Sequence, residues 1–299
     1  MGSSNSTTSK PASAISKPRL RTLKSGTYED LADTTVKYKI VQEITRKALQ
    51  LLSTPEGKSS LVQVARIIVR ETDQDQLTIK EEEFRQRPTW YIDRFLSAVA
   101  EEFPNIDLKA MHSDSQPTLY DWGTDVEKYS PRAHGYLELN ETVLDQMDGI
   151  QQSTPKDAMP HQRYYIFKFL MIIATAHELV HFLRGYLLAS GSPQTPPKVR
   201  VSGYETHPDD DLCGLPRGEA GRFWETILLG GIVESWTNPS IKPSDENYKT
   251  QAGIPYLLQD GAVTAGARLI PKQTALEFAA GSKCLYNYSE VLSCPCINK

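Results

Sequence analysis

Two histidines and one glutamate, placed within five consecutive residues, are the side chains of this chain best suited to chemistry. His177, Glu178 and His181 form the pattern His-Glu-x-x-His. Residues four apart on a helix lie on one face, so His177 and His181 can direct two imidazole nitrogens at one zinc ion. Glu178 projects about 100° away from His177 and can accept a proton from a water molecule beside such an ion. The spacing therefore predicts a Zn2+ site with a general base.

The residues around this pattern are apolar, which makes polar side chains without partners costly there. Leu179, Val180 and Phe182 lie between and beside the three polar residues. Burying histidine and glutamate in such a helix costs free energy unless each polar group has a partner. A metal ion would supply that partner. The alternative is a pair of structural core histidines beside a paired glutamate.

A third metal ligand is expected from a glutamate-rich segment that follows a long loop. Glu219, Glu225 and Glu234 are the candidates for returning to the metal on a second helix. Glu219 is preferred, because it opens that helix and because Gly218 and Gly221 would let the two backbones approach closely. Glu225 is the alternative ligand, and a role in supporting another ligand would also suit it.

The segment Ala-Thr-Ala-His-Glu-Leu-Val-His-Phe-Leu resembles the active-site helix of the zincin metallopeptidases. The resemblance implies an α+β, zincin-like fold, rich in helix, with a small mixed sheet beside the active-site helix. In that superfamily the substrate lies along an edge strand of the sheet. Residues 136–139 alternate apolar and polar, and a helix is expected after Asn140, so this segment stands where the edge strand and the next helix would be.

The third ligand distinguishes the subgroups of that superfamily. The metzincin pattern His-Glu-x-x-His-x-x-Gly-x-x-His is absent, whereas the gluzincin arrangement takes a glutamate from a later helix, which would be Glu219. The usual gluzincin Glu-x-x-x-Asp is missing, because Phe223 follows Glu219 and Leu229 follows Glu225 at that offset. The aspartate that usually partners a ligand histidine is therefore not expected here.

We expect from these residues a zinc-dependent hydrolase, a metallopeptidase in which Glu178 activates water for attack on an amide carbonyl. The expected substrate is a peptide or a small amide. One alternative keeps the site but acts on a single small metabolite, as a tailoring enzyme does. Another is a non-catalytic protein that zinc stabilises, in which His207 or Cys213 would complete a closed four-ligand shell.

Composition limits the remaining functions. The formal net charge of -4 and the mixed signs give no sign of a nucleic-acid partner. The N-terminus lacks the apolar stretch of a signal peptide, so a cytoplasmic location is expected. Gly2 and Ser6 fit an N-myristoylation pattern, although the Ser- and Thr-rich composition favours disorder. The apolar run 169–176 is shorter than a membrane span and predicts a buried core helix.

Composition and apolar spacing also predict how the chain is organised. Residues 1–25 are expected to form a disordered tail, and residues 26–299 a single catalytic domain. Segment 61–69 is rich in Val and Ile and predicts a strand, with a helix as the alternative. Residues 190–218 are expected to be a long loop with one short strand at 199–201. Helices are expected over 28–52, 80–103, 161–189, 219–236 and 272–280.

Several polar residues outside this pattern have two interpretations. Tyr204 and His207 could reach the site from the long loop and stabilise an oxyanion, and His207 with the acids at 209–211 could hold a second ion. Ordinary loop positions are the simpler interpretation of each. Cys294 and Cys296 could chelate a metal or form a redox pair, but without a second pair at ligand spacing they are more often incidental.

Overall fold

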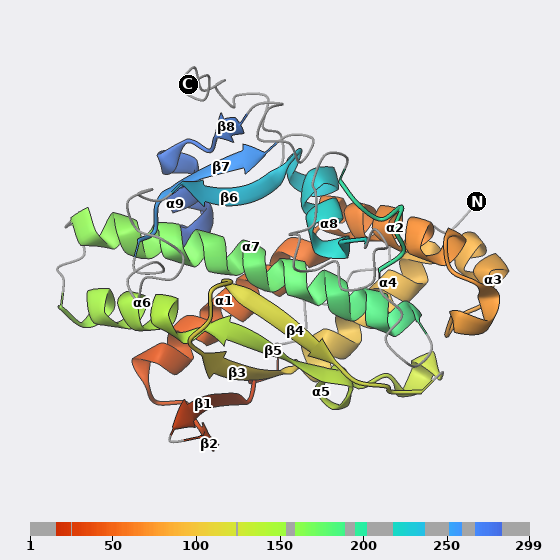
Figure 1. Ribbon diagram of the computed structural model, residues 1–299, viewed down its shortest axis with the longest axis horizontal. Coiled ribbons are helices and arrows are strands. Elements are labelled where there is room, and N and C mark those ends of the chain that lie inside the picture. Colours follow the sequence, from red (N-terminus) through yellow and green to blue (C-terminus); the bar gives the residue numbers. More distant parts are fainter. Residues whose placement is uncertain are drawn as a thin grey trace, which may run out of the picture.

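A long helix between two sheets organises the molecule. The computed structural model describes residues 16–24, 26–123, 125–153, 159–188, 195–201, 218–236, 251–258 and 267–282. Helix α7, Met159–Leu187, crosses the middle of the molecule, with a five-stranded sheet on one side and a three-stranded sheet on the other (Figure 1). This combination of helices and separate sheets confirms the predicted α+β class.

The five-stranded sheet is mixed, with the strand order β2-β1-β3-β5-β4. Its three inner strands, β1, β3 and β5, are parallel, and the two edge strands are antiparallel to their neighbours. The strands are β1 Leu20–Lys24, β2 Thr27–Asp30, β3 Asn105–Lys109, β4 Ser115–Leu119 and β5 Gly135–Asn140.

The predicted strand at 136–139 lies within β5, but it is not the edge strand that the sequence suggested. β5 is an inner strand, and β4 forms the edge beside α7. Strand β5 is buried along most of its length, which explains its apolar residues. β4 carries Pro117, a residue that an edge strand tolerates because its missing N–H can face outward. Its polar sequence, Ser-Gln-Pro-Thr-Leu, gives little strand signal.

The predicted boundary of the N-terminal tail is wrong, because β1 lies within residues 1–25. Leu20 is buried in the core at 1% exposure. The Arg21 guanidinium donates two hydrogen bonds to the Asp107 carboxylate, at 2.6 and 2.7 Å, which ties β1 to β3. These long-range contacts give order to a segment whose composition resembles that of a tail. Residues 1–15 lie outside the described chain.

The helices differ from the predicted ones mainly at their ends. They are α1 Val36–Ser53, α2 Pro55–Arg70, α3 Glu81–Gln86, α4 Pro88–Glu101, α5 Pro131–His134, α6 Glu141–Ser153, α7, α8 Ala220–Leu229 and α9 Lys272–Ala280. The helix expected over 80–103 is interrupted at Pro88, which begins α4 because proline suits a first helical turn. The helix expected over 28–52 begins only at Val36, where the Thr35 side chain caps it.

Two segments expected to be strands are not strands. Residues 61–69 belong to α2, which was the alternative interpretation. The fully buried Leu61, Val64, Ala65 and Ile68 recur at helical spacing, and the Thr54 side chain with Pro55 starts the helix. Residues 199–201, expected to be a short strand, form an irregular segment.

The helix expected over 219–236 ends at Leu229. Gly230 follows with a φ of +79°, the left-handed conformation that ends helices and that glycine adopts without strain. The chain then enters β6, Ile232–Trp236, and Glu234 therefore lies on a strand. β6 pairs with β7, Ile254–Leu258, which pairs with β8, Ala267–Leu269, in an antiparallel sheet. The last helix, α9, has the predicted bounds 272–280.

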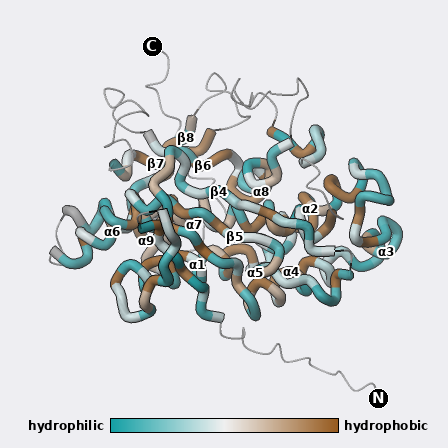
Figure 2. Tube along the Cα trace, turned by 60° about the horizontal axis from the view of Figure 1, so that its bottom comes forward, coloured by the Kyte–Doolittle hydropathy of each residue, from teal (hydrophilic) through white to brown (hydrophobic). Residues whose placement is uncertain are grey.

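Helix α7 forms the centre of the hydrophobic core, as the sequence predicted. Phe169, Ile172, Ala176 and Leu179 are fully buried. Among the described residues, His161–Leu187 is the one stretch long and apolar enough to cross a membrane, yet 78% of its most apolar part is buried inside the protein. Figure 2 places the mostly hydrophilic α3 at one end of the molecule, away from this apolar centre. Helix α7 therefore offers few positions for polar side chains, and His177 and His181 share one of its faces.

Candidate metal centre

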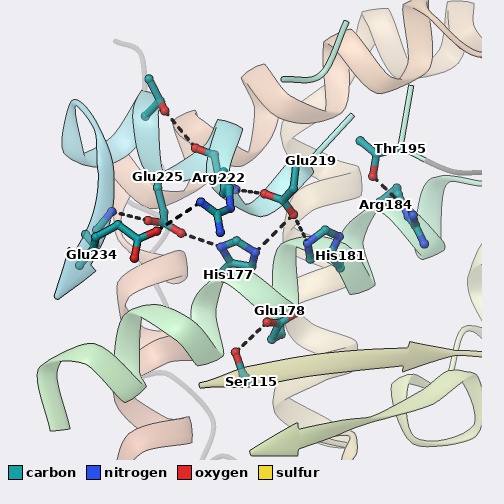
Figure 3. Close-up of polar contacts among 12 residues, drawn as sticks. Ser115, His177, Glu178, His181, Arg184, Thr195, Glu219, Arg222, Glu225 and Glu234 are labelled. Carbon is teal, nitrogen blue, oxygen red and sulfur yellow. Dashed lines mark hydrogen bonds and ion pairs between the residues drawn. The ribbon is translucent and has the colours of Figure 1, made fainter. Parts of the chain in front are cut away.

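Three side chains from two distant segments converge above α7. His177 and His181 lie one turn apart on the helix, and Glu219 comes from the residue just before α8 (Figure 3). Glu219 Oε1 lies 2.5 Å from His181 Nε2 and 3.3 Å from His177 Nε2. The three potential ligand atoms lie within 4.8 Å of one another. Within the described part of the chain, they form the group of such residues that could hold a metal ion.

Helix α8 can approach the histidines because Gly221 has no side chain. A Cβ atom at Gly221 would lie 2.3 Å from His177 Cδ2 and 2.4 Å from His177 Nε2, closer than carbon atoms tolerate. This close approach is the one predicted from Gly221. The glycine is therefore a steric requirement of the site.

Glu219 is fixed at the start of α8 by its own side chain and by its backbone. Its Oε2 accepts a hydrogen bond from the Arg222 backbone N–H, as an N-cap residue does. Its backbone N–H donates to Val199 O at 2.7 Å, and the Gly218 N–H donates to Thr195 O at 3.1 Å. These bonds leave Glu219 Oε1 directed at the two histidines.

Glu225 partners His177 from the side opposite Glu219. Glu225 Oε1 lies 2.6 Å from His177 Nδ1, and Glu225 Oε2 accepts a hydrogen bond of 2.7 Å from the Val233 backbone N–H. A carboxylate on one imidazole nitrogen holds the ring in the orientation that leaves the other nitrogen available to a metal. The usual aspartate partner is not expected here, because the Glu-x-x-x-Asp motif is missing, but a supporting role was one of the two predicted for Glu225. The structure shows that Glu225 provides it.

Glu178 points away from this group, toward the edge strand of the large sheet (Figure 3). The Ser115 hydroxyl, at the start of β4, donates a hydrogen bond of 2.7 Å to Glu178 Oε1. Glu178 is 5% exposed, and its Oε2 has no hydrogen-bond partner among the described residues. One buried oxygen is thus oriented and the other remains able to accept a proton. No pattern in the sequence pointed to Ser115, which lies 63 positions from Glu178 along the chain.

The electrostatics of the group are those of a site that attracts positive charge. Burial opposes protonation of His177, but Glu219 and Glu225 outweigh it and raise the pKa of His177 well above its usual value. Burial likewise opposes ionisation of Glu219, but His177 and His181 outweigh it and hold the pKa of Glu219 well below its usual range. Glu219 is therefore an ionised carboxylate, as a metal ligand must be, and a divalent ion binding here would displace the proton that the two glutamates favour on His177.

A cavity of about 240 Å³ adjoins His177, one of the three potential ligands. One wall is the start of β4 at Ser115, and the opposite wall comes from α8 and β6, including Arg222 and Glu234. Helix α7 contributes His177 and Glu178 to its lining. Of the three glutamates proposed as the third ligand, Glu219 reaches both histidines, Glu225 supports one, and Glu234 instead pairs with Arg222 at 3.3 Å.

The donor set suits zinc. Two imidazoles and one carboxylate form a common catalytic zinc shell, and the two histidines are at the helical spacing that such shells use. The remaining residues singled out from the sequence, namely Gly2, Ser6, Tyr204, His207, Asp209, Asp210, Asp211, Cys213, Cys294 and Cys296, lie outside the described residues. Comparisons with protein-family models, with curated proteins and with solved structures find no match to this chain.

Proposed function

We propose that this protein is a zinc-dependent hydrolase of amide bonds, a metallopeptidase with a gluzincin-type site and a zincin-like fold. The observation that carries the proposal is the convergence of His177, His181 and Glu219, with Glu178 beside them as a buried carboxylate. The three residues offer ligand atoms within 4.8 Å of one another. Two features separate this arrangement from a pair of core histidines: Gly221 makes room for the approach, and Glu225 orients His177.

His177, His181 and Glu219 would hold the zinc ion. When bound, zinc supplies Lewis-acid chemistry, polarising a carbonyl and lowering the pKa of water. Glu178 accepts the proton of the attacking water at Oε2, the oxygen that has no partner among the described residues. It then passes this proton to the leaving amine. Ser115, by donating to Oε1, holds the Glu178 carboxylate in the orientation that both transfers need.

The edge strand β4 offers a place for an extended substrate. Asn140 N–H donates to Asp114 O at 3.0 Å, and Tyr120 N–H donates to His134 O at 2.5 Å. Because hydrogen-bonded pairs alternate in an antiparallel ladder, Ser115 and Leu119 direct their backbone groups away from β5. No strand among the described residues pairs with that outer edge. A peptide can therefore add to it as a further strand, in the mode known as β-augmentation.

The experiment measures bound zinc and peptide hydrolysis together in the wild-type protein and in Glu178→Gln. We expect both to bind zinc, because Glu178 is not among the ligands. We expect the variant to lose at least about a hundredfold in kcat/KM, since it lacks the proton acceptor. Glu82→Gln, an exposed position on α3, serves as the control and should keep both properties.

Three results bear differently on the proposal. Zinc-loaded protein that cleaves peptides equally well with Glu178→Gln would contradict the assigned base. Protein that binds zinc and cleaves no peptide would exclude the peptidase function and favour a small-metabolite substrate. Protein that binds no zinc would exclude the metal site itself.

A further inference from the structure

The cavity beside the metal ligands has two kinds of wall. Leu170, Ile173 and Ala174 of α7 form an apolar strip along it. Ala174 precedes His177 by one helical turn and is only partly buried, so a methyl group is all that separates the cavity from the helix backbone there. This strip can contact the methylene groups of a long substrate side chain that lies next to the amide being cleaved.

The rest of the described lining is polar and holds more carboxylates than cations. Asp114, Glu225 and Glu234 line it against a single guanidinium, that of Arg222. Glu178 also lines the cavity, is 5% exposed and has an oxygen without a partner among the described residues. A bound zinc ion would offset the charges of Glu178 and Glu219. Glu225 is held by His177 and the Val233 N–H, and Glu234 pairs with Arg222. The described lining still holds more carboxylates than cations.

Serine hydroxyls complete the polar part. Ser113 and Ser115 line the cavity from the β4 side, and Ser235 lines it from β6. Hydroxyl and carboxylate oxygens accept hydrogen bonds, and the ammonium group of lysine and the guanidinium of arginine are donors only. An anionic side chain would instead be repelled by carboxylates on the β4 side, from Asp114, and on the α8 and β6 side, from Glu225 and Glu234.

We propose that this cavity takes the side chain of a substrate residue and selects a lysine or arginine there. The inference rests on the proposed hydrolase function and adds its substrate class. The apolar strip contacts the methylene stem, and the carboxylates with the serine hydroxyls accept hydrogen bonds from the cationic end. The volume of about 240 Å³ fits one long side chain.

The test uses the zinc-loaded protein and a set of peptides identical except at one position, which is lysine, norleucine or glutamate. Each position is varied in turn, with free and acetylated N-termini. We expect one position at which kcat/KM for lysine exceeds that for glutamate by at least about tenfold, whether or not the N-terminus is acetylated. A preference that follows the free N-terminus would overturn the assignment to a side chain, and equal cleavage of all three peptides would overturn charge selection.

Substitutions that replace a carboxylate by an amide of the same shape test whether the cavity causes the lysine preference. Glu234→Gln should lower the ratio of lysine to norleucine kcat/KM by about tenfold. Asp114→Asn should lower the same ratio and leaves both residues of the Arg222–Glu234 ion pair in place. Asp75→Asn, an exposed control in the turn Gln74–Gln76, should leave the ratio unchanged. Cavity variants that keep the wild-type ratio would place the selectivity elsewhere and overturn the proposal.

Binding separates this inference from the hydrolase proposal. Zinc-loaded Glu178→Gln protein is titrated with the same fluorescent peptides and anisotropy is measured. Tighter binding of lysine peptides without any cleavage by the wild type would sustain charge selection and remove the hydrolase function. Cleavage without any charge preference would sustain the hydrolase function and overturn charge selection. Absence of both binding and cleavage would overturn both.

Discussion

The carboxylate of Glu225 shows how a single side chain can support a metal site without touching the metal. It is 4% exposed and bridges His177 Nδ1 and the Val233 backbone, so it joins α7, α8 and β6 at one point. Its role is to hold the imidazole ring, which it does with the charge-assisted hydrogen bond that metal-ligating histidines commonly make.

Replacing Glu225 by glutamine should weaken zinc binding by about 10- to 100-fold while leaving the fold intact, because the amide keeps the shape and loses the charge. Competition with a coloured chelator measures the affinity. Glu219→Gln is the reference variant, and its zinc affinity should fall further because the substitution changes a ligand. An affinity equal to that of the wild type would contradict the role assigned to Glu225.

Gly221→Ala should also impair zinc binding, because the added Cβ would lie 2.3 Å from the His177 ring. Gly149→Ala in α6 is the matched control, since a Cβ there would meet nothing within 4 Å. In the control, alanine should instead stabilise the helix by up to about 1 kcal/mol. Zinc affinity and thermal unfolding of the two variants, measured side by side, distinguish a local clash from a general effect of glycine replacement.

The sequence could predict those site residues that lie close together in the chain or beside a local signal. His177, Glu178 and His181 follow from helical geometry, and Glu219 from its place beside two glycines. The contacts of Glu225 with His177 and of Ser115 with Glu178 join residues far apart in the chain. No periodicity encodes them, so they emerge only when the helices and the sheet edge are placed in space.

At the scale of elements, a second histidine shows how α7 is joined to the large sheet. His134 ends α5, just before β5, and packs its ring against Gly185 of α7 and the rings of Trp122 and Tyr129. It is 3% exposed, and neither ring nitrogen has a hydrogen-bond partner among the described residues. Burial lowers the pKa of His134 to about 4.

Acidification should therefore destabilise this junction. The usual pKa of a histidine is near 6.5 in the unfolded chain, so between pH 6.5 and 4 the unfolded state binds a proton that the folded state excludes. The contribution of His134 to stability is present above pH 6.5 and is lost as the pH falls, by up to about 3 kcal/mol below pH 4.

The free energy of unfolding, measured from pH 7 to pH 4 in denaturant, tests this. His134→Phe should have a shallower pH dependence than the wild type, because phenylalanine does not titrate. His112→Gln, at an exposed position, should retain the wild-type slope. A His134→Phe slope as steep as that of the wild type would show that other groups cause the acid sensitivity.

The elements that sequence patterns could predict are those with a clear period or a clear stop signal. The bounds of α9 and the existence of α7 and β5 were predicted from apolar spacing. Segment 61–69 was ambiguous, because β-branched residues favour strands while their burial at helical spacing decides for a helix. β1 and β4 were missed, since both are short and polar and owe their order to pairing with distant strands.

At the scale of the whole molecule, a bound metal would link α7 to the start of α8. Zinc that binds only the folded state should raise the free energy of unfolding by about 2.7 kcal/mol at a free concentration a hundred times its dissociation constant. Thermal unfolding with added zinc and with chelator measures this shift. His181→Ala should abolish the shift, whereas Glu178→Gln should keep it. A shift retained in His181→Ala would mean that zinc stabilises the protein at another place.

The two hydrogen bonds between segment 195–199 and segment 218–219 have a consequence for how this protein can change. They hold the chain on either side of residues 202–217 together, next to Glu219. The length of the connection between them is therefore uncoupled from the position of the ligand. In general, doubling the length of a connection between two fixed ends costs only about 0.6 kcal/mol in loop-closure entropy. Insertions after Val201 should therefore leave Glu219 in its place beside the histidines.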